Sequence, residues 1–180
     1  MDIIQVNDRK FKKFIPAGQI DKTVRGLAGR LNLDLKDKDP LFVVVLNGAF
    51  IFASDLFRNI SLDSEIAFIK LSSYAGMKST KKVREVVGLD RSVADRTVVI
   101  LEDIIDTGRT MGYAMNRFRE MGAKDVRLVT LLFKPGAFDE AYKIDYTGME
   151  IPNDFIVGYG LDYDGYGRNY KDIYRVVRDQ

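Results

Sequence analysis

The sequence of 180 residues contains neither cysteine nor histidine. Without cysteine there is no disulfide bond, no zinc–thiolate site and no thiol nucleophile, and a reducing compartment fits this composition. Without histidine, serine–histidine and cysteine–histidine catalysis and imidazole ligation of a metal are excluded too. Any catalysis must therefore use carboxylates, lysine, arginine, tyrosine, hydroxyl groups, backbone amides or a metal held by oxygen.

Long apolar runs and an excess of one charge are also missing. The purest apolar run, residues 41–46, is far too short to span a bilayer. The first residues, MDIIQ, lack the basic and apolar regions of a signal peptide. The 28 basic and 26 acidic residues give a formal net charge of +2, too balanced to indicate nucleic-acid binding. We therefore expect a cytoplasmic protein with neither a membrane nor a nucleic-acid partner.

Helical and extended patterns alternate along the chain. Apolar residues recur at helical spacing over about 16–31, from 52 to 60 in a helix that follows Asn47-Gly48, and over about 110–121. Extended patterns lie between them, at 41–46, 65–71, 97–101 and 126–133, with shorter ones at 155–159 and 173–177. Continuous β-branched runs such as 41–46 are typical of parallel strands buried on both faces. The order predicts one α/β domain with a doubly wound, mainly parallel sheet and helices on both faces.

Polar residues follow three of the predicted strands, at Asn47-Gly48, at 72–74 and at 102–110. Ligands of such sheets bind beyond the carboxyl ends of the strands. In the third segment, Thr107-Gly108-Arg109-Thr110 offers hydroxyl groups, a flexible glycine and the amides of a helix N-terminus, which together can hold a phosphate.

Three carboxylates, Glu102, Asp103 and Asp106, stand directly before this phosphate cradle, which we define as residues 107–110. Carboxylates repel a bare phosphate, so the ligand must also bring hydroxyl groups or a cation. A ribose phosphate with bound Mg²⁺ meets both conditions. The alternative interpretation is a capped helix with acidic residues at its positive end.

Residues 98–111, VVILEDIIDTGRTM, closely resemble the signature of type I phosphoribosyltransferases, which bind phosphoribosyl pyrophosphate (PRPP). The EDIIDTG form is most similar to the hypoxanthine/guanine branch, and the resemblance extends from about residue 41 to 168. It implies a core of about 17–134 with the C-terminal strand. It also implies a small hood formed by the N-terminus and about 135–170, and a homodimer or homotetramer.

The resemblance also implies roles for the acidic segment. Glu102 and Asp103 would hold the ribose hydroxyls, and residues 107–110 the 5′-phosphate. Asp106, which also lies in the ribose phosphate site, would stand beside purine N7 as the general base. Mg²⁺ is the implied cofactor, with Glu102, Asp103 and Asp162 as the residues associated with it.

Two further groups of residues follow from the resemblance. The pyrophosphate would contact Asn47, Gly48, Ser73, Tyr74 and Arg168, and the basic stretch after Tyr74 would form a mobile lid. The purine would contact Ile105, Lys134, Phe155, Ile156 and Asp162. Many relatives carry a basic residue in place of Asn47, which leaves the backbone amides as the contact. A lysine ammonium only donates hydrogen bonds, so Lys134 should favour a 6-oxopurine over adenine.

The implied reaction joins hypoxanthine or guanine to PRPP with release of pyrophosphate, as in purine salvage. Structural interpretations of the same residues stay open: a turn that needs Gly48, a surface lysine at 134 and a core aromatic at 155. One rival function is an RNA-binding regulator of pyrimidine genes with the same fold. The near-neutral charge argues against it, because contacts to RNA phosphates need an excess of basic residues. Another rival is an adenine or xanthine phosphoribosyltransferase.

Overall fold

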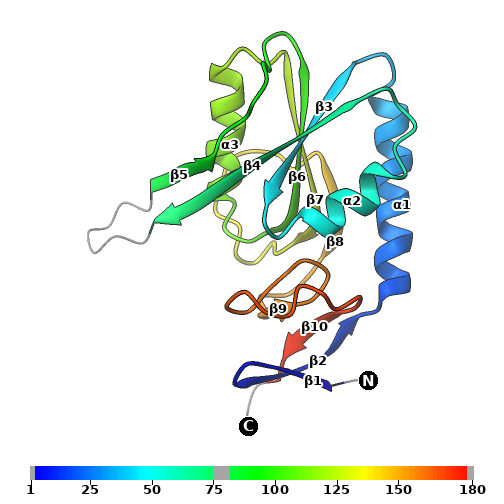
Figure 1. Ribbon diagram of the computed structural model, residues 1–180, viewed down its shortest axis with the longest axis vertical. Coiled ribbons are helices and arrows are strands. Elements are labelled where there is room, and N and C mark those ends of the chain that lie inside the picture. The colour runs from blue at the N-terminus through cyan, green and yellow to red at the C-terminus, as the bar shows by residue number, and fades with distance from the viewer. Residues whose placement is uncertain (1–2, 75–81, 178–180) are drawn as a thin grey trace.

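The computed structural model describes residues 3–74 and 82–177, without the side chains of 72–74 and 82–86 (Figure 1). A six-stranded sheet has the order β5-β4-β3-β6-β7-β8, and a four-stranded sheet has the order β1-β2-β10-β9. The strands of the larger sheet are β3 (Pro40–Leu46), β4 (Glu65–Tyr74), β5 (Lys82–Val87), β6 (Thr97–Ile105), β7 (Asp125–Phe133) and β8 (Tyr146–Glu150). Those of the smaller are β1 (Ile3–Val6), β2 (Arg9–Ile15), β9 (Ile156–Val157) and β10 (Ile173–Val176).

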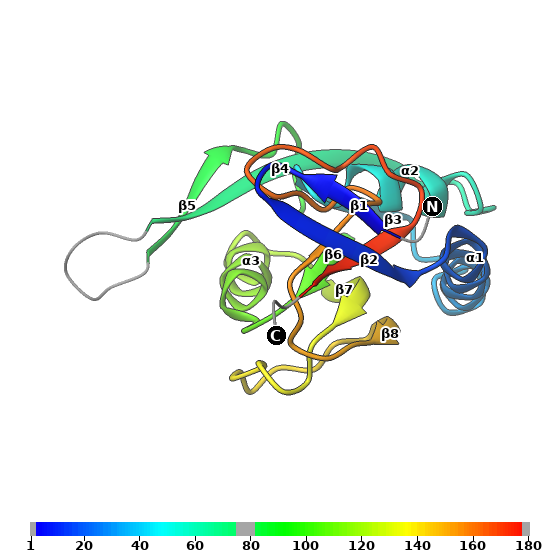
Figure 2. The same cartoon turned by 90° about the horizontal axis from the view of Figure 1, so that it is seen from below.

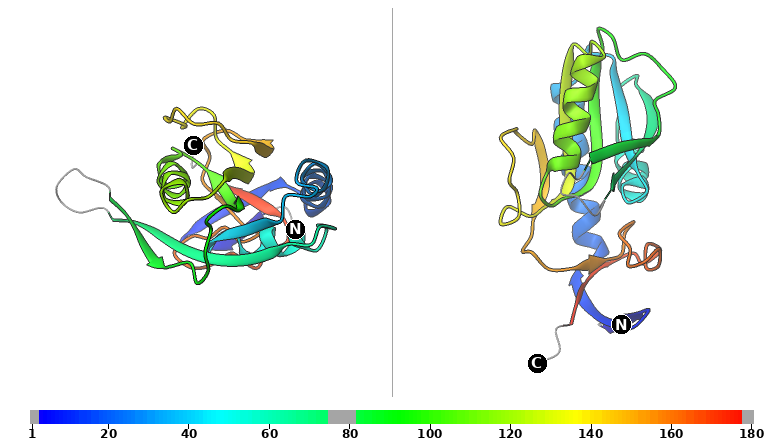
Figure 3. Two further views of the ribbon diagram at one scale, coloured as in Figure 1. Left: turned by 90° about the horizontal axis from the view of Figure 1, so that it is seen from above. Right: turned by 90° about the vertical axis from the view of Figure 1, so that its left-hand side faces the viewer.

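The larger sheet is parallel from β4 to β8, and only β5 runs antiparallel to its neighbour. Three helices cover it: α1 (Ala17–Asp34), α2 (Phe50–Phe57) and α3 (Arg109–Glu120). Phe42 and Val44 pack against α1 and α2, whereas Val43 and Ile100 pack against α3. Figure 3 shows α1 and α3 on opposite sides of the central strands. The predicted doubly wound α/β fold is confirmed.

The buried stripe of α1 is the one that the sequence predicts: Ile20, Val24, Leu27, Ala28 and Leu31. The second predicted helix stops at Phe57 instead of residue 60, and the predicted strand at 155–159 is only Ile156–Val157. The strands β1, β2, β5 and β8 were not predicted. In β2, four of the residues 9–13 are basic, and only Phe11 and Ile15 are buried, so the apolar signal is short.

The smaller sheet lies beyond the carboxyl ends of the parallel strands, as the view from below shows (Figure 2). The prediction that the C-terminal strand belongs to the core was wrong: β10 pairs with β2 and β9 in this smaller sheet. The reason is a separate small core, in which Tyr174 packs with Phe11 and Val157. Conversely, β8 falls within the predicted hood range but extends the larger sheet beside β7.

Asp172 fastens the smaller sheet to the start of α1. Its carboxylate accepts a hydrogen bond from the Ala17 amide at 2.7 Å and pairs with Lys13 Nζ at 3.0 Å. These two partners, the amide first, lower the pKa of Asp172. Of the helices in residues 3–74 and 82–177, none has the length and hydrophobicity needed to cross a bilayer.

Replacing Asp172 with Asn should lower the free energy of unfolding at pH 7 by about 1 kcal/mol, because the neutral amide can still accept from the Ala17 amide but loses the charge that interacts with Lys13 and the helix N-terminus. Because the pKa is lowered in the folded state, this contribution exists above the unfolded pKa and disappears as the pH falls through the folded pKa. Urea denaturation of both proteins at pH 7 and near pH 2.5 measures the difference. A difference that stays equal at both pH values would contradict this role.

Candidate active site

A cavity of about 220 Å³ opens at the carboxyl ends of the parallel strands. It lies between the ends of β3, β4 and β6 and the start of α3 and is lined by Val45, Leu46, Leu71, Glu102, Ile104, Ile105, Asp106, Thr107, Gly108, Thr110 and Met111. Six of the predicted site residues are therefore gathered around one space: Glu102, Ile105, Asp106, Thr107, Gly108 and Thr110. Met111 was missed, although it belongs to the apolar stripe that predicts α3.

The phosphate cradle lies where β6 turns into α3. Gly108 has a φ of +85°, the left-handed region that glycine adopts most easily, and it precedes the first residue of the helix. The amides of the first helical turn have no partner within the helix, so they can donate hydrogen bonds to an anion. The Arg109 side chain lies outside the cavity lining and pairs with Asp139 at 3.7 Å. Its contribution to the cradle is therefore its backbone amide.

The two adjacent acids on β6 differ in exposure, although their carboxyl groups lie within hydrogen-bond distance of each other. Glu102 lines the cavity, whereas Asp103 is buried and does not line it. Asp103 accepts a hydrogen bond from the Ile104 amide at 2.9 Å, and a Cβ at Gly48 would overlap its carboxylate. Burial, followed by the negative charge of Asp103, raises the pKa of Glu102 well above its usual range, and burial raises the pKa of Asp103 as well. Two neighbouring carboxyls in this setting favour an added positive charge.

Asp106 and Lys134 come together from the ends of β6 and β7. Lys134 Nζ lies 3.1 Å from Asp106 Oδ2, and the Lys134 side chain is only 10% exposed. The Lys134 amide also donates to the Ile105 carbonyl at 3.0 Å, so the backbone fixes the pair. The structure thus joins the predicted general base to the residue predicted to read the purine.

The predicted pyrophosphate residues lie on two elements. Asn47 and Gly48 follow β3, where the Leu46–Asn47 peptide is cis. A Cβ at Gly160 would overlap the Gly48 carbonyl, so the 158–168 segment rests directly on this loop. Arg168 is fixed there: it donates to the Gly160 carbonyl at 2.6 Å and pairs with Asp162 at 2.7 Å.

This pairing affects the metal prediction. The Asp162 carboxylate is engaged by Arg168 and by the Gly165 amide at 2.7 Å. Among residues 3–74 and 82–177, no group of three acidic side chains forms a metal-binding cluster. The predicted set of Glu102, Asp103 and Asp162 is therefore not assembled by the protein alone.

Phe155 directly precedes β9 in the chain and is 42% exposed, which leaves part of the residue uncovered. Its ring centre lies 5.6 Å from that of Tyr163, which it meets edge-on, and 6.2 Å from that of Phe11, to which it is tilted by 45°. The next residue, Ile156, is buried. Both supporting aromatics were missed by the sequence analysis, although Phe11 stands out as an apolar residue among basic ones.

Ser73 and Tyr74 end β4, and their side chains lie outside the described part of the chain, as do residues 75–81 of the predicted lid. Residues 82–87, also in the stretch predicted to be a lid, form strand β5 along β4. The roles of Ser73 and Tyr74 stay predictions.

Strand β6 thus ends in carboxylates beside the start of α3, as the resemblance of residues 98–111 to type I phosphoribosyltransferases implies. The model of the phosphoribosyl transferase domain family matches residues 16–164, and the chain belongs to this family.

Similar proteins narrow the class. The chain is 40% identical to the hypoxanthine-guanine phosphoribosyltransferase of Bacillus subtilis over 159 residues, which are 88% of each protein. It is 41% identical to the bifunctional protein TilS/HprT of Listeria innocua, of which the match spans 24%. A hypoxanthine-guanine phosphoribosyltransferase structure from Bacillus anthracis superposes with a TM-score of 0.88 at 35% identity, covering 92% of this chain and 98% of that one.

The contact of Gly48 with Asp103 leads to a stability prediction. Gly48→Ala should lower the free energy of unfolding by about 1–3 kcal/mol, because the added methyl group must displace a buried carboxylate. Gly26→Ala, in open space on α1, is the control and should raise it by up to about 1 kcal/mol. Urea denaturation measures both changes. Unchanged stability of Gly48→Ala would show that the Gly48–Asp103 contact is not tight.

Proposed function

We propose that the protein transfers the 5-phosphoribosyl group of PRPP to hypoxanthine or guanine, giving the nucleoside monophosphate and pyrophosphate. The observation that carries this proposal is the Lys134–Asp106 pair at the cavity, next to the phosphate cradle. A 6-oxopurine presents its O6 acceptor beside N7. Lys134 can donate to O6 while Asp106 accepts a proton from N7, whereas adenine would turn an amino group toward the ammonium.

The same cavity suits the ribose phosphate. The amides and hydroxyls of residues 107–110 would take the 5′-phosphate, with Ile105 against the base. Glu102, together with Asp103, would accept hydrogen bonds from the ribose hydroxyls. The amides of Asn47 and Gly48 and the Arg168 guanidinium would hold the pyrophosphate, and the exposed part of Phe155 would stack on the purine, with Ile156 contacting its edge.

In the reaction, purine N9 forms a bond to the anomeric carbon as the bond from that carbon to the pyrophosphate oxygen breaks. Positive charge develops on the ribose ring, as in other glycosyl transfers. Asp106 takes the proton that the base must lose, and its position beside N7 sets the orientation of the base. Glu102 and Asp103 on the other side add negative charge near the ribose.

Mg²⁺ fits this site. Glu102 and Asp103 have raised pKa values even though the positive charge of Arg168 acts to lower that of Asp103, and a divalent cation would supply further positive charge. These two residues would hold the ion together with substrate oxygens, because Mg²⁺ is commonly bound by few carboxylates. When bound, the ion would neutralise charge on the leaving pyrophosphate. Asp162 would join them only if its pair with Arg168 opens.

The direct test is incubation of the protein with PRPP, Mg²⁺ and each nucleobase in turn, with the product identified by mass. Hypoxanthine and guanine should give nucleotides, whereas adenine should give none. Product from adenine alone would overturn the proposed specificity, and product from xanthine would widen it.

We also propose that the protein is a cytoplasmic homodimer or homotetramer. Light scattering would measure the mass of the assembly.

Asp106→Asn should lower kcat by about a hundredfold or more, because the amide cannot take the proton from the base. Asp63→Asn, in an exposed loop before β4, is the matched control and should leave kcat unchanged. Steady-state release of pyrophosphate measures both variants. Near-normal turnover of Asp106→Asn would remove Asp106 from its proposed role.

Lys134→Ala should reduce kcat/KM for hypoxanthine by about tenfold to a hundredfold, the usual weight of a hydrogen bond from a charged donor. The Kd for PRPP should change less than about threefold, since one such bond to the purine does not touch the ribose phosphate. Initial rates at varied hypoxanthine and calorimetric titration with PRPP measure the two quantities. An equal loss in both would argue against the contact with the purine.

A further inference from the structure

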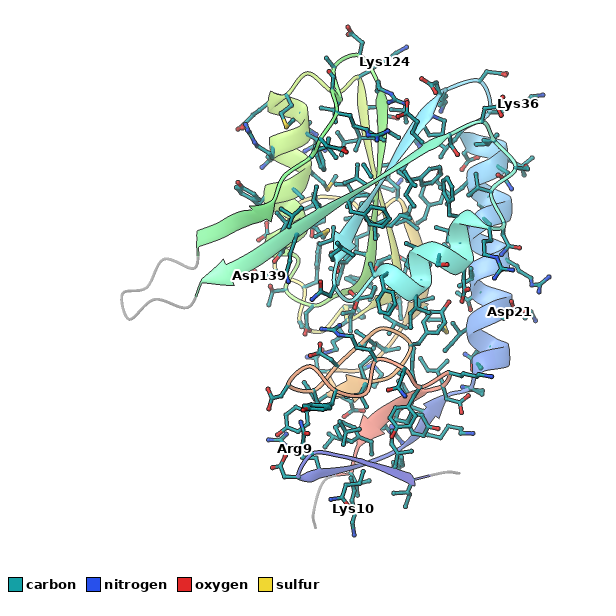
Figure 4. The ribbon with its side chains drawn as sticks, viewed as in Figure 1. Arg9, Lys10, Asp21, Lys36, Lys124 and Asp139 are labelled. Atoms are coloured by element: carbon teal, nitrogen blue, oxygen red, sulfur yellow. The ribbon has the colours of Figure 1, made fainter. Side chains whose placement is uncertain are left out.

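The phosphate cradle is held from its outer side by a segment far along the chain. Residues 138–142 lie between β7 and β8, and Asp139 marks this segment in Figure 4. The Phe138 ring stands edge-on to Phe133 and to Tyr142, at 5.3 Å from each. Through this chain of rings the segment is anchored to the end of β7. None of residues 138–142 lines the cavity itself.

Two hydrogen bonds run from the segment to the cradle. The Tyr142 hydroxyl donates to the Gly108 carbonyl at 2.6 Å, and the Asp139 amide donates to the Thr107 carbonyl at 3.2 Å. The Thr107 carbonyl is therefore turned toward the 138–142 segment. The Gly108 carbonyl is held both by this segment and by α3, because it also accepts a hydrogen bond from the Gly112 amide at 3.0 Å. In a trans peptide the N–H points opposite to the carbonyl of the same unit. Fixing these two carbonyls thus aims the amides of Gly108 and Arg109 the other way.

The packing leaves the cradle little room to move. A Cβ at Gly108 would lie 2.5 Å from Phe138 Cε2 and 2.7 Å from the Tyr142 hydroxyl. Burial, followed by the negative charges of Glu140 and Glu102, raises the pKa of the Tyr142 phenol. The hydroxyl therefore stays protonated, and remains a donor, at every pH at which the protein would work.

We propose that Tyr142 is a positioning residue for the 5′-phosphate: its hydroxyl fixes the Gly108 carbonyl and so directs the cradle amides at the anion. The inference rests on the proposed function, because it takes residues 107–110 as the phosphate site. Tyr142 touches no substrate and acts only through Gly108. A loosened cradle should weaken the binding of phosphate-bearing ligands and leave the chemistry at the purine untouched.

Tyr142→Phe tests this directly, because it removes one hydroxyl and keeps the ring that packs against Phe138. The Kd for ribose 5-phosphate and the KM for PRPP should rise about threefold to tenfold, the usual range for one hydrogen bond, with kcat within about twofold. The control is Tyr146→Phe. Tyr146 also donates through its hydroxyl, to Asp34 at 2.9 Å, but on the far side of β8 from the cradle. The Tyr146→Phe variant should have a lower Tm but an unchanged Kd for ribose 5-phosphate and an unchanged KM for PRPP.

Calorimetric titration with ribose 5-phosphate and steady-state kinetics with PRPP separate the outcomes. An unchanged Kd in Tyr142→Phe, or an equal loss in Tyr146→Phe, would overturn the role of Tyr142. If the unaltered protein binds ribose 5-phosphate but makes no nucleotide from any base, the proposed function fails while the role of Tyr142 is still decided by the titration. If it binds neither ribose 5-phosphate nor PRPP, both proposals fall.

Discussion

The pairing of β6 with β7 fixes the chemistry of the site. Ile105 lies opposite Phe133 in this parallel pair, so the next residues, Asp106 and Lys134, leave the sheet side by side. A shift of one residue would turn either side chain to the other face and separate the carboxylate from the ammonium. The register is held by buried residues on both faces, such as Ile100 and Leu101. The apolar interior of the sheet therefore sets the distance between two charged groups at the carboxyl ends of β6 and β7.

The charges around the cavity balance only when ligands are considered. Glu102 and Asp103 have raised pKa values, and the start of α3 lines the same cavity as Glu102. An anion alone would be repelled by the carboxylates, and a cation alone would be repelled by the N–H groups of the helix start. A ligand that carries phosphate, hydroxyl groups and a metal ion satisfies both sides. In the free protein, Asp106 and Lys134 neutralise each other, as do Asp162 and Arg168.

Much of this arrangement could be predicted from the sequence, because its signals are local. The continuous apolar runs of β3, β6 and β7 predict parallel strands, and the cradle follows β6 without a gap. The strands of the smaller sheet were harder to predict, because β2 is mostly basic and β10 pairs with β2 from the other end of the chain. Tyr142 was missed since its contact with Gly108 spans 34 residues.

The contact between Gly160 and the Gly48 carbonyl brings two stretches of bare backbone together, far apart in the sequence. Gly160 also has a φ of +98°, so no side chain suits it on either ground. The loop that follows β3 is thereby seated against the 158–168 segment. A larger residue at position 160 would push this segment away from the end of β3, so a single glycine sets how closely the two sheets approach at this point.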